Sequence, residues 1–247
     1  MREGAGPEVI DLPAGIPPVR VLPRDADVSA AFSSTTHEQV WSEMLDANGQ
    51  LHDGPIWAVR SIGPDALVVQ ADQYKRLAVQ ADPRIGDLGV RLLGVKGLLV
   101  GRDASGTERI LLARRGGQTR IYQGLWETAP AGGIDVRQLL GHQAVRETLL
   151  TELHEELGLT MPPGVQERIV AALRDPIARS VDLIARIDWP DAVNPHATLC
   201  HTGTHAWEYI DSAWTSPQDV AAMLANNPAT LSPPTLAVLR WLGWVGG

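Results

Sequence analysis

Three glutamates in the second half of the chain have the residue type and the spacing to act on one target. Glu155 and Glu156 follow Glu152 by three and four residues, so on a helix the three side chains share one face. Carboxylates at these spacings repel one another, and near the end of a helix they also oppose its dipole. A hard divalent cation would offset both costs, because Mg²⁺ takes one or two carboxylates together with water and phosphate oxygens. On spacing alone, an ordinary solvated acidic surface is the alternative.

The helix that must carry these glutamates is the clearest element in the sequence. Between about Gly141 and Leu157, apolar residues recur four apart, and Gly158 stands at the usual stop position of a helix. The glutamates therefore lie beside an apolar stripe, in the last two turns. The stripe consists of Val145, Leu149, Leu153 and Leu157.

A glycine-containing loop precedes this helix. It runs from Trp126 to Gly133 with the sequence WETAPAGG. The paired glycines, Gly132 and Gly133, permit unusual backbone angles and the close approach of another group. A Gly-Gly pair by itself is most often only a turn, so its meaning depends on the helix that comes after it.

Taken together, the glycine loop and the glutamates of the helix resemble the Nudix box. The box contains a glycine, a glutamate, and then the pattern Arg-Glu-apolar-x-Glu-Glu-x-Gly-apolar. In this chain PAGG is followed by ELHEELGL, so Glu152–Leu159 matches the pattern from its second position to its end. The flanking stretches ILLARRG and WEYIDSAW are similar to the strands around the box in that family. The similarity covers roughly residues 90 to 247.

The first half of the box departs from the family pattern. Thr151 occupies the arginine position and Gln143 the upstream glutamate position, and the spacing from Gly133 to Gln143 is about four residues too long. In the family the arginine orients a box glutamate, so we expect weaker catalysis unless Arg146 or another cation takes this role. Gln143 still offers a neutral oxygen ligand.

The resemblance implies an activity. It predicts a metal-dependent hydrolase that cleaves the diphosphate linkage of a nucleoside diphosphate derivative, of the nucleotide-sugar or ADP-ribose type, to a nucleoside monophosphate and a phosphorylated product. The cofactor would be Mg²⁺ or Mn²⁺, which activates water and neutralises phosphate oxygens. By resemblance to the family, Glu155 and Glu156 would be the principal metal ligands, and Glu152 a ligand or the general base. Some members take the base from a later loop, for which Glu208 is the candidate.

Further residues are assigned to substrate binding by the same resemblance. Gly132 and Gly133 would place backbone near the metals, while Trp126 and Arg114 would contact the substrate. Other candidates each have an ordinary structural explanation as well. Trp57 and Trp207 are core or stacking residues, Arg115 and Arg120 are phosphate ligands or solvated charges, and His201 and His205 are substrate contacts or surface histidines.

The remaining pattern predicts an α/β (α+β) fold. Strand signals in VRLLGVKGLLVG and RILLARRG, separated by the turn at residues 103–106, indicate a hairpin. SVDLIARIDW and HAWEYIDSAW are further strands, and Ser216-Pro217 and Ser232-Pro233 begin two helices. This order favours a mixed β-sheet sandwiched between helices, as in the Nudix fold. We therefore expect a Nudix domain over residues 90–247.

The front segment, residues 1–89, is predicted as a small N-terminal α+β extension. Its first 30 residues are rich in Gly, Pro and Asp and predict an irregular arm outside the core. A helix ends near Asn48-Gly49, and short strands follow at Ile56–Arg60 and Ala66–Gln70. The segment faintly resembles the part preceding the box in the animal Nudix hydrolase of UDP-glucose. This favours a nucleotide sugar over a nucleoside triphosphate and leaves ADP-ribose open.

Composition restricts the partners. The chain has 247 residues, a net charge of -8 and 21 scattered Lys and Arg residues, so no basic stripe is available for a nucleic-acid polymer. No apolar stretch is long enough to cross a membrane. Cys200 is the single cysteine, which suits a reducing compartment. We expect a cytoplasmic protein that binds a small nucleotide, with a homodimer as an option for its assembly.

Two other functions stay open. A Nudix-fold nucleotide-binding or regulatory module could have kept the pocket while losing turnover, to which Thr151 and Gln143 lend weight. A Nudix-fold enzyme could also carry out other metal-dependent diphosphate chemistry in a biosynthetic pathway.

Overall fold

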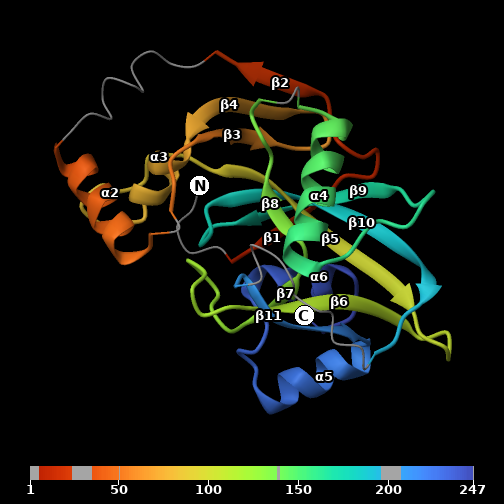
Figure 1. Cartoon of the computed structure of the whole chain (residues 1–247). Coiled ribbons are helices and arrows are strands. Elements are labelled where there is room, and N and C mark those ends of the chain that lie inside the picture. The colour runs from red at the N-terminus through yellow and green to blue at the C-terminus, as the bar shows by residue number, and fades with distance from the viewer. Residues whose placement is uncertain (1–5, 24–34, 50, 138–139, 196–206, 247) are drawn as a thin grey trace.

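The computed structural model describes residues 6–23, 35–49, 51–137, 140–195 and 207–246. Within these residues eleven strands join in one mixed sheet, with helices on both of its faces (Figure 1). In the described part of the chain, no helix has the length and apolar character needed to cross a membrane.

Seven strands form the main path of the sheet. Most neighbours along it are antiparallel, whereas β10 pairs with β5 and β2 with β4 in parallel. The order is β1 (Glu8–Asp11), β9 (Glu167–Asp175), β10 (Ser180–Ala192), β5 (Leu92–Arg102), β3 (Pro55–Ile62), β4 (Leu67–Gln73) and β2 (Val19–Leu22).

The other strands extend from the central strand β5. The expected hairpin is present, because β6 (Glu108–Arg115) folds back on the end of β5. Strand β6 also pairs with β7 (Trp126–Thr128) and β11 (Tyr209–Thr215), while β8 (Ala131–Gly133) pairs with β5. The glycine loop is therefore held against the same strand that begins the hairpin.

Helices cover the two faces of the sheet. The helix α4 (His142–Leu157) places its leucine stripe in a core with Leu93 and Val95 of β5. On the other face, α5 (Pro217–Asn226) and α6 (Pro233–Trp241) pack over Leu98 and Val100. Side chains alternate along a strand, so β5 supplies both cores. The prediction of a mixed sheet sandwiched between helices is confirmed.

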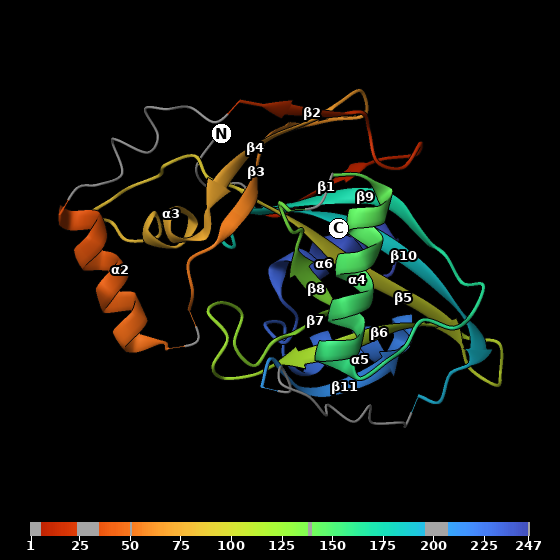
Figure 2. The same cartoon turned by 45° about the horizontal axis from the view of Figure 1, so that its top comes forward.

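The front segment also packs against this sheet. The helices α2 (Thr35–Ala47) and α3 (Tyr74–Val79) contact each other through Trp41 and Val79 and stand beside β3 and β4 (Figure 2). Ala58 of β3 pairs with Leu92 of β5, so the sheet continues from the front segment into the rest of the chain.

The prediction of an irregular arm is wrong for residues 8–22. Strand β1 pairs with β9 and β2 pairs with β4, and Leu12 between them is 2% exposed in the main core. Each strand is only four residues long. Such short strands show little alternation of their own, and the edges of the sheet supply their hydrogen bonds.

Candidate functional site

The site is built at the C-terminal end of α4, where strand β8 passes the helix. Gly158 ends the helix in the left-handed conformation with φ of 64°, and its N–H donates to the carbonyl of His154. This is the backbone geometry for which glycine is preferred after a helix. The last two turns, with all three glutamates, are thereby held in a regular helix beside the glycine loop.

Glu156 lies inside the protein rather than on its surface. Its side chain accepts a hydrogen bond from the backbone N–H of Ala131 at 2.9 Å, and the residue is 2% exposed. Burial, with added repulsion from Glu152 and Glu208, raises the pKa of Glu156 well above its ordinary value. Glu155, the next residue toward the N-terminus, is exposed. The 100° step between them turns Glu156 toward the core.

Gly132 is the residue that allows Glu152 to reach this place. A Cβ atom at Gly132 would lie 2.0 Å from Oε1 of Glu152 and 2.6 Å from its Cγ. The carboxylate therefore packs directly on the backbone of β8. At Gly133 the nearest atoms to such a Cβ belong to Leu92, at 3.6 Å. The two glycines are not equivalent, and only Gly132 is required to lack a side chain by contact with Glu152.

Glu208 joins the cluster from a segment distant in the sequence. It precedes β11, and its carbonyl accepts a hydrogen bond from the N–H of Gly116 at 2.7 Å. A Cβ at Gly116 would stand 2.0 Å from the carbonyl oxygen of Trp207. This close backbone contact holds the turn before β11 near the end of α4. The structure thus brings the candidate base Glu208 to the box glutamates.

A cavity of about 520 Å³ opens over these groups, and we call it the glutamate pocket. Glu152, Glu155 and Glu208 line it together with Gly132 and Gly133. The rest of its wall comes from Trp207, from the loop between β6 and β7, and from the front segment. The wall residues contributed by that loop and that segment include Gln118, Arg120, Asn48, His52 and Tyr74.

The front-segment residues of this wall were missed by sequence reasoning. Asn48 and His52 lie between the end of α2 and the start of β3. The sequence did not show what this connection approaches, because the pairing of β3 with β5 is a contact between distant segments.

Other predicted residues lie elsewhere. Trp126 packs on the core beneath α6, and Arg114 donates through Nε to the carbonyl of Gly124 at 3.0 Å. Neither residue lines the glutamate pocket, and their assignment to substrate binding stays a prediction. Trp57 is a core residue. Cys200, His201 and His205 lie outside the described residues.

Arg146 does not replace the missing box arginine. It pairs with Glu167 of β9, whose side chain is 1% exposed, at the opposite end of α4 from the box glutamates. Gln143 is also turned away, and its amide donates to Glu147 at 2.8 Å. Thr151 is exposed. The two residues that depart from the family pattern therefore make no contact with the glutamate pocket.

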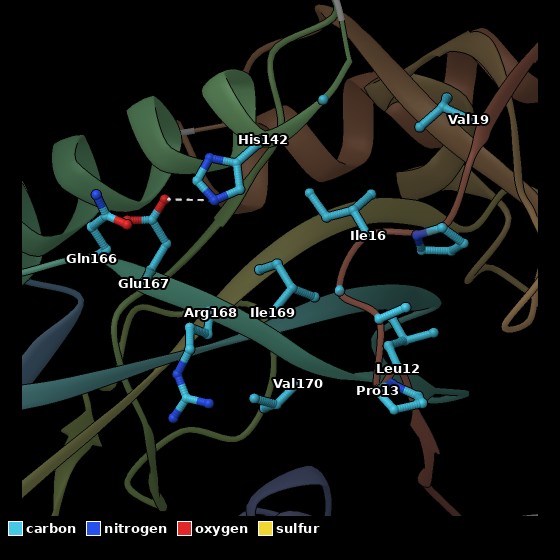
Figure 3. Close-up of a pocket in the computed structure, with 14 residues that line it drawn as sticks. Leu12, Pro13, Ile16, Val19, His142, Gln166, Glu167, Arg168, Ile169 and Val170 are labelled. Atoms are coloured by element: carbon cyan, nitrogen blue, oxygen red, sulfur yellow. Dashed lines mark ion pairs between the residues drawn. The ribbon is translucent and has the colours of Figure 1, made fainter.

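A separate cavity of about 770 Å³ lies at that N-terminal end of α4 (Figure 3). Ile16 and Ile169 form an apolar side, and His142 faces Glu167 with 3.5 Å between Nε2 and Oε1. None of the three box glutamates lines it. The larger cavity and the carboxylate cluster thus belong to opposite ends of one helix.

A buried ionic network holds the first residues of the glycine loop. Lys96 of β5 binds Glu127 of β7 with 2.9 Å between Nζ and Oε2, and both side chains are at most 6% exposed. Arg115 and the hydroxyl of Tyr209 contact the other oxygen of Glu127. Burial alone would raise the pKa of Glu127, but Lys96 and Arg115 outweigh it and lower the pKa to about 2. Glu127 is therefore a fixed anion, and a lysine inside an apolar strand was the sequence signal for such a partner.

Asp182 of β10, close to this network, should make the free energy of unfolding depend on pH. Burial raises its pKa to about 6, although Lys96 and a hydrogen bond from Ser180 act in the opposite direction. The folded protein keeps a proton that the unfolded chain releases near pH 4, so the free energy of unfolding falls as pH rises between about 4 and 6. We expect Asp182→Asn to reduce this fall by up to roughly 3 kcal/mol.

Urea unfolding at pH 4.5 and pH 7 measures the effect of this substitution. Asp188→Asn is the matched control, because Asp188 lies on the same strand with its side chain 55% exposed. An equal pH dependence in the parent and in Asp182→Asn would show that Asp182 is not the group that titrates.

Comparison with known proteins finds similarity to solved structures. No protein-family model matches the sequence, and no curated protein matches it. The NUDIX domain of NrtR from Shewanella oneidensis, solved with ADP ribose, is 20% identical with a TM-score of 0.44, over 66% of this chain and 91% of that one. A protein from Deinococcus radiodurans is 15% identical with a TM-score of 0.48, over 76% of this chain and 98% of that one. A NUDIX hydrolase from Alicyclobacillus acidocaldarius is 14% identical with a TM-score of 0.44, over 62% and 91%.

The carboxylates of the box helix and Glu208 are the chemical type of donor that a hard divalent cation takes. As the side chains stand, no group of three His, Cys, Asp or Glu residues in the described ranges is arranged to hold an ion. Yet Glu156 is buried against the charges of Glu152 and Glu208, an arrangement that disfavours three ionised carboxylates. All the acidic groups offer oxygen atoms, which Mg²⁺ and Mn²⁺ prefer as ligands. A bound cation would offset the repulsion that, in addition to burial, raises the pKa of Glu156.

Proposed function

We propose that this protein is a metal-dependent Nudix hydrolase that cleaves the diphosphate linkage of a nucleoside diphosphate derivative. The observation that carries the proposal is the convergence of carboxylates at one place: Glu152 and Glu208 line one pocket, and both act electrostatically on the buried Glu156 beside them. The box resemblance selects these glutamates from the sequence, and their packing on β8 supports a shared task. A solvated acidic face would leave Glu156 in water, and it is buried.

Each residue has a distinct part in the proposed reaction. Glu155 and Glu156, with Glu152, would hold Mg²⁺ or Mn²⁺, which supplies charge neutralisation for the diphosphate and a water of lowered pKa. Gly132 and Gly133 let the substrate approach the backbone of β8. Arg120, which also lines the pocket, would donate hydrogen bonds to the diphosphate. Glu152 or Glu208 accepts the proton of the attacking water, since both lie at the pocket.

The test is a panel of substrates. The protein is incubated with nucleotide sugars, ADP-ribose and nucleoside triphosphates, each with Mg²⁺ or Mn²⁺, and nucleoside monophosphate is measured. We expect release from at least one diphosphate derivative and a slower reaction with triphosphates. Absence of nucleoside monophosphate from every compound, at millimolar metal, would overturn the proposal.

Metal binding can be measured separately, through the melting temperature of the protein. Because the metal neutralises repelling carboxylates in the folded state only, millimolar Mg²⁺ or Mn²⁺ should raise the melting temperature by mass action. A diphosphate compound added with the metal should raise it further. If the melting temperature is unchanged with metal, both alone and with nucleotide, these glutamates do not form a metal site.

Gly132 gives a sharper test of how Glu152 is positioned. In Gly132→Ala the new methyl group must displace Glu152, so we expect turnover to fall roughly 10- to 100-fold while the protein stays folded. Gly63→Ala is the control, since its methyl group would meet no atom within 4 Å and Gly63 lies outside the glutamate pocket. Steady-state kinetics of the two variants compares them directly. Equal activity in both would mean that the contact of Gly132 with Glu152 is irrelevant to the reaction.

A second candidate is a nucleotide-binding module without turnover. Thr151 and Gln143, at the positions that depart from the family pattern, lie outside the pocket. The same panel separates the two functions, because a binding module would be stabilised by nucleotide and metal without releasing a product.

A further inference from the structure

The glutamate pocket continues into a second chamber. This chamber has a volume of about 630 Å³ and lies between the end of α2, the helix α3 and the loop that joins β6 to β7. Figures 1 and 2 show this loop extending from the sheet toward α2. Asn48, Leu51, Gln118 and Arg120 line both cavities. A ligand at the glutamates can therefore extend into the second chamber without leaving the protein surface.

The lining of the second chamber differs from that of the glutamate pocket. None of its described lining residues carries a carboxylate. Three of them carry side-chain amides, namely Asn48, Gln118 and Gln123. Apolar side chains stand among these amides, namely Met44, Leu51 and Ala78. A side-chain amide presents a donor and an acceptor next to each other, which matches the edge of a heterocyclic base. Apolar side chains suit the flat face of such a ring.

Arg120 stands at the junction of the two cavities. Among the described residues that line them, it is the only arginine or lysine. Its Nη2 donates to the carbonyl of Ala178 at 3.4 Å, a long hydrogen bond that engages one of five donors. The cation therefore lies between a region of carboxylates and a region of amides. A diphosphate that joined groups in both regions would pass beside it.

We propose that the second chamber binds the nucleobase of the substrate, with Arg120 beside the diphosphate and the other phosphorylated moiety near Trp207 and His52. This inference rests on the proposed function, which puts the diphosphate at the glutamates and so sets which end of the substrate enters the second chamber. It makes Gln118 a specificity-determining residue and gives α2 and α3 a part in substrate selection. A bare pyrophosphate would leave the chamber unfilled.

The kinetic test uses a pair of substrates with and without the base. Gln118→Ala should raise the KM of the nucleoside diphosphate derivative about 10-fold, the effect of losing one bidentate contact to a base, while kcat stays within about twofold. The same variant should leave the KM of a base-free ribosyl diphosphate compound unchanged. Gln166→Ala, an exposed glutamine at the other end of α4, is the matched control and should match the parent with both compounds. Equal effects of Gln118→Ala on both substrates would overturn the inference while leaving the hydrolase proposal intact.

A binding measurement separates this inference from the proposed function. Calorimetry with nucleoside monophosphates should show binding to the parent and to Glu155→Gln, and about 10-fold weaker binding to Gln118→Ala. If the panel shows no hydrolysis but this pattern appears, the base site stands and the hydrolase proposal fails. If nucleoside monophosphates do not bind the parent, or if Gln118→Ala alters selection among sugars rather than bases, the inference is overturned.

Discussion

Without metal, Glu156→Gln is expected to melt a few degrees higher than the parent. With metal, it is expected to turn over its substrate at least roughly 100-fold more slowly than the parent. The substitution keeps the size of the side chain and removes a buried charge that faces Glu152 and Glu208. Because burial and this repulsion raise the pKa of Glu156, the ionised form destabilises the folded state above the ordinary pKa of a glutamate. Turnover falls because a metal ligand is lost.

Thermal unfolding and steady-state kinetics measure both effects on one sample. Glu147→Gln is the matched control, because Glu147 is exposed on the same helix and lies outside the glutamate pocket. The control should keep the activity of the parent. A Glu156→Gln protein that is more stable and equally active would show that the buried carboxylate has no part in the reaction.

Lys96→Met is expected to lower the free energy of unfolding by about 3–5 kcal/mol, the cost of leaving a buried charge without its partner. Glu127 would keep Arg115 and Tyr209 but lose the cation at its second oxygen. Asp182 would lose the same favourable charge. Since Thr128 accepts a second hydrogen bond from Lys96 at 3.2 Å, the loop that leads to Gly132 should also loosen.

Urea unfolding at neutral pH measures this loss. Lys75→Met provides the comparison, because Lys75 pairs with Glu38, whose side chain is 59% exposed, and such a pair contributes at most about 1 kcal/mol. Similar losses in the two variants would contradict the special weight given to the buried pair.

The elements that carry local signals were predictable. The box helix has four apolar residues at one spacing and a glycine at its end, and the structure places its limits within one residue of the expectation. Ser216 and Ser232 begin α5 and α6 as expected, each with proline after the cap. These signals are local because helix caps and turns depend on neighbouring residues alone.

The assembly of the site was only partly predictable. The spacing of the glutamates fixed which side chains share a face, but the burial of Glu156 depends on β8 passing the helix. The approach of Glu208 depends on the contact of its backbone with Gly116, about ninety residues earlier in the chain. The second chamber depends on α2 lying near the β6–β7 loop. Each is a contact between distant segments, which spacing in the sequence does not encode.

The most direct measurement is the release of nucleoside monophosphate by the parent and by the double variant Glu155→Gln/Glu156→Gln, with Mg²⁺ and the best compound of the panel. Our account predicts that the parent releases the product, and that the double variant folds, gains no stability from metal and reacts at least roughly 100-fold more slowly. A folded double variant that releases nucleoside monophosphate at the rate of the parent would contradict the central claim, that these glutamates form the metal site of a diphosphate hydrolase.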